Sequence, residues 1–156
     1  MPITDQAIRR TLTVPAPPDR AFALFTERLA TWWPRRYTWA QEALGAISIE
    51  PWQGGRCLEL SKDGDEAVWG RVLEWEPPRR LVLSWQIGPE REYVPHPAKA
   101  SEVEVRFEAR GPTATRVELE HRGFDRHGEG SLRCRAGLDS PEGWTLILDR
   151  FAAAAA

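Results

Sequence analysis

The sequence contains little cysteine and no pattern of metal ligands. Its two cysteines, Cys57 and Cys134, lie far apart and in no Cys-x-x-Cys or Cys/His spacing. Disulfides belong to oxidising compartments, so we expect two reduced thiols and a cytoplasmic protein. The three histidines, His96, His121 and His127, are too scattered to converge on a metal ion by spacing. We predict no metal site and no cofactor, and we place His96 and His127 in solvated loops.

The chain also lacks an excess of charge and a long apolar run. The formal net charge is −2 and the isoelectric point is about 6.0, without a basic stripe. Nucleic-acid binding through phosphate neutralisation is therefore not expected. No stretch approaches the roughly 20 apolar residues that cross a bilayer. The first residues show no signal-peptide pattern. We expect no membrane insertion, and either a monomer or a homodimer.

Motifs of several enzyme classes are missing as well. The sequence contains no GxSxG, no P-loop and no GxGxxG followed by a predicted helix. These patterns position a nucleophile or cradle phosphates in hydrolases, kinases and dinucleotide enzymes. A member of those three classes is therefore not expected.

Tryptophan, by contrast, is abundant, with eight residues against one Met and two Tyr. Tryptophan is large and amphipathic, so a small domain can bury many of them only around a roomy core or a lined cavity. A chain of 156 residues buries about two-thirds of the surface that its unfolded form exposes. No repeat or linker divides the sequence, and we expect residues 1–156 to form one domain.

Alternation of apolar and polar residues predicts about six to seven strands. The alternation is clearest over 101–109 and 115–121, whose inward positions include Val103, Val105 and His121. One apolar and one charged face are typical of an antiparallel sheet half open to water. The other predicted strands span 7–14, 46–50, 56–61, 67–76 and 80–86.

Helical patterns lie at both ends of this run of strands. Residues 18–33 favour a helix, because Pro18 suits the first turn and an apolar stripe with helical spacing reaches Trp32. The last helix is predicted to begin with Ser140 as N-cap and to reach Ala155. The glycine-rich stretch 123–138 between strands and last helix is predicted to be irregular.

This order predicts an α+β fold, in which a twisted antiparallel sheet wraps around the long C-terminal helix. A strongly curved sheet leaves a gap next to such a helix. That gap is either packed solid or used as a pocket.

The order of motifs resembles the helix-grip fold of the START-like (SRPBCC) superfamily, and within it the branch related to the activator of Hsp90 ATPase. The matching pieces are Val14-Pro15-Ala16-Pro17, Trp32-Trp33-Pro34, Gly70-Arg71-Val72-Leu73-Glu74, Pro77-Pro78-Arg79-Arg80-Leu81, Ser84-Trp85, Thr115-Arg116-Val117-Glu118-Leu119, His121-Arg122-Gly123-Phe124 and Gly143-Trp144. The resemblance covers about residues 8–151. The superfamily hosts lipid binders, polyketide cyclases, hydrolases and co-chaperone domains, so the resemblance implies the fold and leaves the function open.

Five tryptophans are the best candidates for lining a pocket that takes a small apolar or aromatic ligand. They are Trp32, Trp33, Trp39, Trp85 and Trp144. The same spacing is equally typical of plain core packing. His121 is either a polar anchor or proton carrier in the cavity, or a buried histidine bonded to a neighbour. Tyr93, in the loop 88–100 that could cover an opening, and Leu148, on the apolar face of the last helix, complete the predicted ligand-binding residues.

Glu74 is the candidate general base. If it shares the inward face with Gly70 and Val72, it is a buried carboxylate with a raised pKa. Trp69 and Trp75 have the opposite parity and favour the other face. The alternation therefore leaves the direction of Glu74 open.

These observations favour a binding protein, rather than an enzyme, that holds a small hydrophobic or aromatic molecule between sheet and last helix. The alternative is an interaction protein that acts on a chaperone or regulator, as the resemblance to Hsp90 activators implies. The outward positions of the predicted sheet are densely charged, which is more typical of a solvated face than of a docking site. A cyclase or hydrolase using His121 and Glu74 is the least favoured interpretation.

Overall fold

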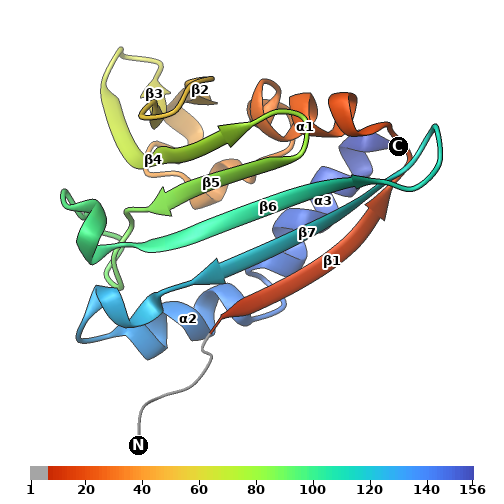
Figure 1. Cartoon of the computed structure of the whole chain (residues 1–156). Coiled ribbons are helices and arrows are strands. Elements are labelled where there is room, and N and C mark those ends of the chain that lie inside the picture. Colours follow the sequence, from red (N-terminus) through yellow and green to blue (C-terminus); the bar gives the residue numbers. More distant parts are fainter. Residues whose placement is uncertain (1–6) are drawn as a thin grey trace, which may run out of the picture.

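The computed structural model describes residues 7–156 of the chain. These residues form an antiparallel sheet of seven strands in the order β1-β7-β6-β5-β4-β3-β2, curled next to the C-terminal helix α3 (Figure 1). The strands are β1 (Ile8–Val14), β2 (Leu44–Ile49), β3 (Arg56–Ser61), β4 (Glu66–Glu76), β5 (Arg80–Trp85), β6 (Ser101–Ala109) and β7 (Thr115–Arg122). The helices are α1 (Pro18–Thr26), α2 (Ser131–Asp139) and α3 (Trp144–Ala155). This architecture confirms the predicted α+β helix-grip fold.

The first strand of the sequence pairs with the last. In the β1–β7 register, Ile8 lies opposite His121 and Val14 opposite Thr115. The strands β2 to β7 follow one another as consecutive antiparallel neighbours. Helix α3 lies against one face of this sheet, and α1 covers the end where α3 terminates (Figure 1). The two helices therefore close one face and leave the other to solvent.

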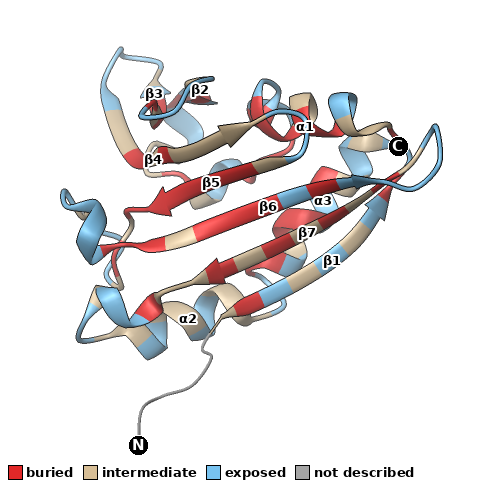
Figure 2. Ribbon diagram, in the orientation of Figure 1, coloured by how far each residue is buried: buried red, intermediate tan, exposed pale blue. Residues whose placement is uncertain are grey.

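The core lies between that inner face and α3. Alternate residues of β6 and β7 are buried, and Figure 2 shows long buried stretches along β5 and β6. Helix α3 contributes Ile147, Leu148 and Phe151, which fall on one face of the helix. Each fully buried side chain of this size stabilises the fold by about 1.5–3 kcal/mol. The helix is therefore held mainly by this apolar stripe.

Strand β4 is irregular at two points, and the irregularities decide which side chains face inward. Its pairing shifts opposite Cys57 and again between Val72 and Glu74. An extra residue moves the side chains that follow to the other face. As a result Trp69 and Val72 are buried, Trp75 packs against α1, and all three lie on the inner side. Simple alternation along β4 cannot describe this arrangement.

The first helix is shorter than predicted. It ends at Thr26, whose hydroxyl donates to the Phe22 carbonyl at 2.8 Å, and the chain continues in 3-10 turns. These turns span Leu29–Thr31, Arg35–Tyr37 and Gln41–Ala43. Leu29 and Trp32 are buried. The apolar pattern therefore predicted their burial correctly, although the backbone at these residues is not α-helical.

The stretch predicted to be irregular contains the helix α2, and the last helix begins later than predicted. The Ser140 hydroxyl donates to the Gly137 carbonyl at 2.7 Å, so this serine caps the end of α2 instead of the start of α3. Gly143 precedes α3, and a Cβ at this position would lie 2.1 Å from the Leu138 carbonyl oxygen. The close turn between the helices thus requires glycine.

Within residues 7–156, no helix combines the length and the apolar character that crossing a bilayer requires. In the same residues, no three His, Cys, Asp or Glu side chains gather as ligands for a metal ion.

Candidate functional site

A partly open cavity of about 270 Å³ lies between the inner face of β2–β5 and the α2–α3 region. Its volume is close to the lower limit of roughly 300 Å³ for small-molecule pockets. The lining comes from four segments of the chain: the strands, the 33–39 segment, the loop after β5, and α2 with the start of α3. The lining residues are Trp33, Tyr37, Thr38, Trp39, Ile47, Glu59, Trp69, Trp85, Ile87, Gly88, Pro89, Arg91, Arg133, Cys134, Gly137, Leu138, Glu142, Gly143 and Ile147.

Tryptophan rings form much of the apolar wall. The rings of Trp33 and Trp69 are stacked, with centroids 6.0 Å apart and an interplanar angle of 17°. Trp85 meets Trp69 edge-on at 6.1 Å, and Trp39 lines the cavity as well. Such faces and edges pair favourably with another flat ring. The indole N–H of Trp69 is buried and has no acceptor among the described residues.

Trp39 is fixed by a buried carboxylate. The Glu59 oxygens accept the backbone N–H groups of Trp39 at 3.1 Å and Ala40 at 2.8 Å. The Trp39 indole N–H donates to the Arg91 carbonyl at 2.6 Å. Glu59 is only 4% exposed, so these amides replace water as hydrogen-bond donors to its carboxylate. Glu59 therefore positions the wall.

Polar contacts tie the rim of the cavity together. The Tyr37 hydroxyl donates to the Glu142 carbonyl at 2.7 Å, which joins the 33–39 segment to the start of α3. Arg133 of α2 forms an ion pair with Glu90 in the loop after β5. The Arg91 guanidinium donates to the Tyr37 carbonyl at 2.6 Å. The three rim segments are thus connected without filling the opening.

Both cysteines are free, and one of them, Cys134, lines the cavity. Burial raises the pKa of the Cys134 thiol, and the negative charge of Glu92 raises it further. Burial likewise raises the pKa of the Cys57 thiol. A thiol with a raised pKa is a weak nucleophile at neutral pH. The two thiols therefore act as apolar groups.

His121 belongs to a buried hydrogen-bonded chain behind the wall. The Trp144 indole N–H donates to His121 Nδ1 at 3.0 Å, so the ring proton is on Nε2. His121 Nε2–H then donates to Ser101 Oγ at 2.7 Å, and the Ser101 hydroxyl donates to His127 Nε2 at 2.8 Å. Burial holds the pKa of His121 well below its ordinary value, so the ring is neutral. This chain orients Trp144, whose ring lies 5.6 Å from that of Trp85.

His127 was expected in a solvated loop, and that prediction was wrong. It lies at the end of the 3-10 turn Phe124–His127, half-buried against Ser101. Burial lowers the pKa of His127. His96 is exposed, as predicted.

The structure divides the predicted ligand-binding residues into three groups. Trp33, Trp39 and Trp85 line the cavity. Trp144 lines a smaller void of about 10 Å³, together with Trp33 and Trp85. The others lie away from both spaces: Trp32, Tyr93, His121 and Leu148.

Packing explains these other positions. The Trp32 indole donates to the Leu24 carbonyl at 2.8 Å and its ring packs against Phe151, so it belongs to the core beneath α1 and α3. Leu148 is buried in the same core, one position along α3 from the cavity residue Ile147. Tyr93 is 44% exposed, and its backbone pairs with that of Ile87 within the loop after β5.

Several lining residues were missing from the sequence-based set. Trp69 was passed over because the irregularities of β4 hide its inward direction. Glu59 carried a signal, since a carboxylate between Leu58 and Leu60 interrupts an apolar strand. Arg91 lies in a loop and Arg133 in a short helix. In neither segment does a periodic pattern predict the direction of the side chain. Their place on the cavity depends on tertiary structure alone.

Glu74, whose direction the alternation leaves open, faces outward and is not a buried base. Its side chain is 46% exposed and lies on the outer face, where Arg80 donates to both carboxylate oxygens at 2.7 and 3.0 Å. These hydrogen bonds from Arg80 lower the pKa of Glu74, whereas a buried base would have a raised one. The bulge before Glu74 turns it away from the cavity.

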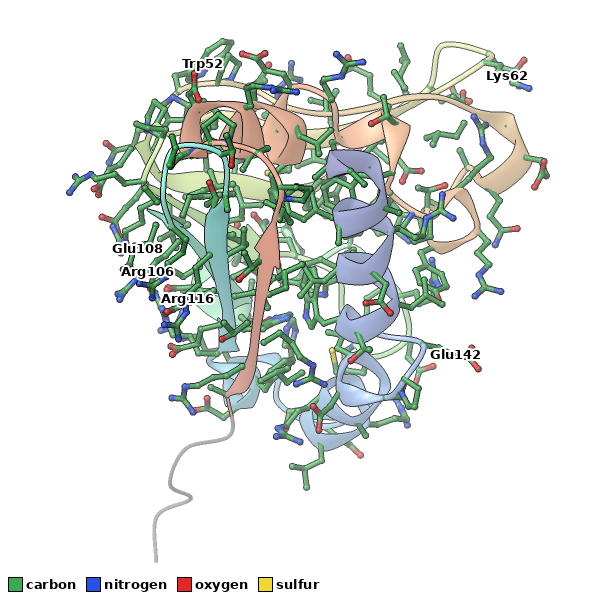
Figure 3. The ribbon with its side chains drawn as sticks, turned by 90° about the vertical axis from the view of Figure 1, so that its right-hand side faces the viewer. Trp52, Lys62, Arg106, Glu108, Arg116 and Glu142 are labelled. Carbon is green, nitrogen blue, oxygen red and sulfur yellow. The ribbon has the colours of Figure 1, made fainter. Side chains whose placement is uncertain are left out.

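The outer face of the sheet is a network of ion pairs centred on Glu104. Figure 3 shows Arg106 and neighbouring charged side chains projecting from the sheet away from α3. Burial alone would raise the pKa of Glu104, but hydrogen bonds from Arg80, Arg122 and Arg106 outweigh it and lower the pKa to about 2. The charges on this face are therefore largely paired within the protein.

Comparison with known proteins gives a family and structural neighbours. The family model described as activator of Hsp90 ATPase homolog 1-like protein matches residues 15–156. No curated protein sequence matches the chain.

We describe three of the solved structures that are similar to this chain. The anthrahydroquino-γ-pyrone synthase Txn09 is 40% identical, with 94% of this chain and 95% of that chain covered and a TM-score of 0.67. The self-sacrificing resistance protein CalC from Micromonospora echinospora is 30% identical, with coverages of 96% and 94% and a TM-score of 0.70. DynU16, a putative protein in the dynemicin biosynthetic locus, is 23% identical, with coverages of 96% and 46% and a TM-score of 0.61, and it shows the fold alone.

Proposed function

We propose that this chain, which belongs to the activator of Hsp90 ATPase homolog 1-like family, binds a flat fused-ring aromatic molecule in its tryptophan-lined cavity. The observation that carries the proposal is the wall itself. Trp33, Trp39, Trp69 and Trp85 converge on one partly open space from three different parts of the chain. Affinity would come from burial of apolar area, at about 25 cal/mol per Å² before the costs of association.

The polar groups of the wall favour binding over acid–base chemistry. Both oxygens of Glu59 accept backbone amides, and the Tyr37 hydroxyl donates to a carbonyl. The Cys134 thiol is kept protonated by burial. His121 does not line the cavity. Of the two carboxylates in the lining, Glu59 is thus engaged by amides, and Glu142 extends away from the body of the protein (Figure 3), so neither is placed as a base inside the cavity.

A second candidate function is ring closure of such a molecule. One observation favours it: the relative with 40% identity over nearly the full chain is an anthrahydroquino-γ-pyrone synthase. A cavity without its own base could still promote an intramolecular reaction by holding a flexible substrate in a folded conformation. The binding proposal underlies both candidates.

The test is a titration of the purified protein with anthraquinone, followed by tryptophan fluorescence. Cys134 allows a matched pair of variants, because its side chain lines the cavity and forms no disulfide. Cys134→Phe adds a ring to the cavity, and Cys134→Ala leaves the space open. We expect saturable quenching, weakened about tenfold or more, or about 1.4 kcal/mol, in Cys134→Phe. Cys134→Ala should bind like the wild type.

The outcomes separate the candidates. Absence of saturable quenching by a folded protein, or equal affinity in Cys134→Phe, would show that the cavity is not a ligand site. Ring closure is tested by incubation with an open-chain precursor of an anthrahydroquino-γ-pyrone and mass spectrometry of the product. Binding without turnover would leave the first candidate alone.

A further inference from the structure

The rim of the cavity carries two arginines whose charges are compensated differently. Arg133 forms an ion pair with Glu90. Arg91, the next residue after Glu90, forms no ion pair with a carboxylate of the described residues, and its guanidinium donates to the Tyr37 carbonyl. A carbonyl dipole does not neutralise a full charge. Arg91 therefore presents a net positive charge at the cavity, with donors left over, since a guanidinium has five N–H groups.

The two acidic neighbours of Arg91, Glu90 and Glu92, have partners other than Arg91. Glu92 bends back so that its carboxylate accepts the backbone N–H of Glu90 at 2.8 Å. The Arg91 N–H donates to the Gly88 carbonyl at 2.9 Å, and the Arg91 carbonyl accepts the Trp39 indole. Arg91 has φ +63°, a conformation that a side-chain-bearing residue adopts at some cost. Contacts on both sides of the residue thus hold this one cation in place.

The carboxylates of the lining have other contacts than Arg91. The Glu59 carboxylate, which also lines the cavity, accepts the two backbone amides of Trp39 and Ala40. Glu142 contributes to the lining, but Figure 3 shows its side chain extending away from the body of the protein. The cavity therefore combines an aromatic wall with one rim cation, Arg91, that forms no ion pair with a carboxylate of the described residues.

We propose that the cavity selects flat aromatic molecules that carry an anionic oxygen, such as a carboxylate, phenolate or enolate, and that Arg91 is the residue that determines this selectivity. The inference rests on the proposed function, because it assigns a ligand class to the same cavity. Rings would lie against the tryptophans, and the anionic oxygen would accept N–H groups of Arg91. A charge-assisted hydrogen bond at a partly exposed site corresponds to a preference of about 5- to 20-fold over a neutral analogue.

The experiment compares two probes of nearly the same shape, anthraquinone-2-carboxylate and anthraquinone-2-carboxamide. Affinities are measured by tryptophan quenching on the wild type, Arg91→Gln, Arg91→Lys and Arg79→Gln. Circular dichroism and thermal unfolding establish that each variant is folded. Arg79→Gln is the control, because it removes an arginine of similar kind that pairs with Glu76 and lies outside the cavity lining.

We expect the wild type and Arg79→Gln to prefer the carboxylate, and Arg91→Gln to bind both probes with the affinity of the carboxamide. Arg91→Lys should retain part of the preference, because it keeps the charge without the planar fork. Raising the salt concentration should reduce the preference in the wild type. All of these changes concern the ratio of the two affinities, which a general loss of structure would not alter selectively.

The failures are distinguishable. If neither probe binds to the folded wild type, the proposed function is wrong, and this inference falls with it. If both probes bind with equal affinity, the cavity is a ligand site without selectivity for anions. If a folded Arg91→Gln keeps the preference, the selectivity does not come from Arg91.

Discussion

Replacing Glu59 by glutamine tests the physical account of the cavity wall. The Glu59 carboxylate accepts the amides of Trp39 and Ala40, at 3.1 and 2.8 Å. Glutamine has the same shape, but its amide nitrogen cannot accept a hydrogen bond. One of the two backbone N–H groups therefore loses its acceptor, and the other keeps a neutral one.

The expected loss follows from these two changes. A buried donor without acceptor costs about 1–3 kcal/mol, and a charge-assisted bond is about twice as strong as a neutral one. The neutral glutamine offsets part of this loss in stability, because no buried charge has to be desolvated on folding. We expect the free energy of unfolding to fall by about 2 kcal/mol. For 156 residues, this corresponds to a fall of about 4–8 °C in Tm.

The control is Glu66→Gln, the same substitution on the neighbouring strand β4. The Glu66 side chain is 55% exposed and pairs with Arg56 at 3.6 Å, so its loss should change stability by less than about 1 kcal/mol. Urea denaturation followed by fluorescence gives both free energies, and titration with anthraquinone gives the effect on binding. Glu59→Gln should also bind more weakly, because Trp39 is less firmly held. Equal stability and equal affinity of the two variants would refute the idea that Glu59 fixes the wall.

Three further predictions concern pH and spectroscopy. Because the folded pKa of His121 is depressed, the unfolded chain takes up a proton that the folded chain cannot, so stability should fall as pH drops below 6.5, by up to about 1.4 kcal/mol per pH unit. In urea denaturation at pH 7.5 and 5.5, His121→Gln should reduce this loss, and His127, whose pKa is also lowered, should supply the rest. Glu104, with a pKa of about 2, contributes stability above its unfolded pKa of about 4.3 that is lost as pH falls toward 2, so Glu104→Gln should flatten the acid-unfolding curve over that range. Trp52 is 53% exposed and outside the cavity, so Trp52→Phe should leave ligand-induced quenching unchanged, whereas Trp85→Phe should reduce it.

The strands could be predicted from the sequence wherever the pleat is regular. In β6 and β7, alternation places Val103, Val105 and Val117 on the inner face, and the structure buries all three. The pattern works because a period of two is dictated by strand geometry and needs no knowledge of the partner strand. Irregularities in pairing are different, since they depend on both strands. The inward direction of Trp69 and the outward direction of Glu74 follow from bulges that β4 alone does not reveal.

Helix α2 escaped prediction for a related reason. Gly123, Gly128 and Gly130 all have positive φ, which is typical of glycine in turns. They precede α2 and do not interrupt it. None of the nine residues of α2 is buried, so its sequence has no apolar stripe from which a helix could be predicted. Its contribution to the cavity through Cys134 and Leu138 depends on contacts far away in the sequence. Local pattern carries no information on such contacts.

The cavity shows a further limit of prediction from the sequence, which two adjacent tryptophans illustrate. Trp32 and Trp33 are both buried, at 1% and 9% exposure, and both were predicted to line a pocket. Their side chains diverge: Trp32 packs against Phe151 in the solid core, and Trp33 stacks on Trp69 at the cavity. Apolar character predicts that a side chain leaves water, because the hydrophobic effect is not directional. Whether the space beyond it is filled depends on the neighbouring elements, and here α1 and α3 close over Trp32, whereas the short, half-exposed α2 leaves room beside Trp33.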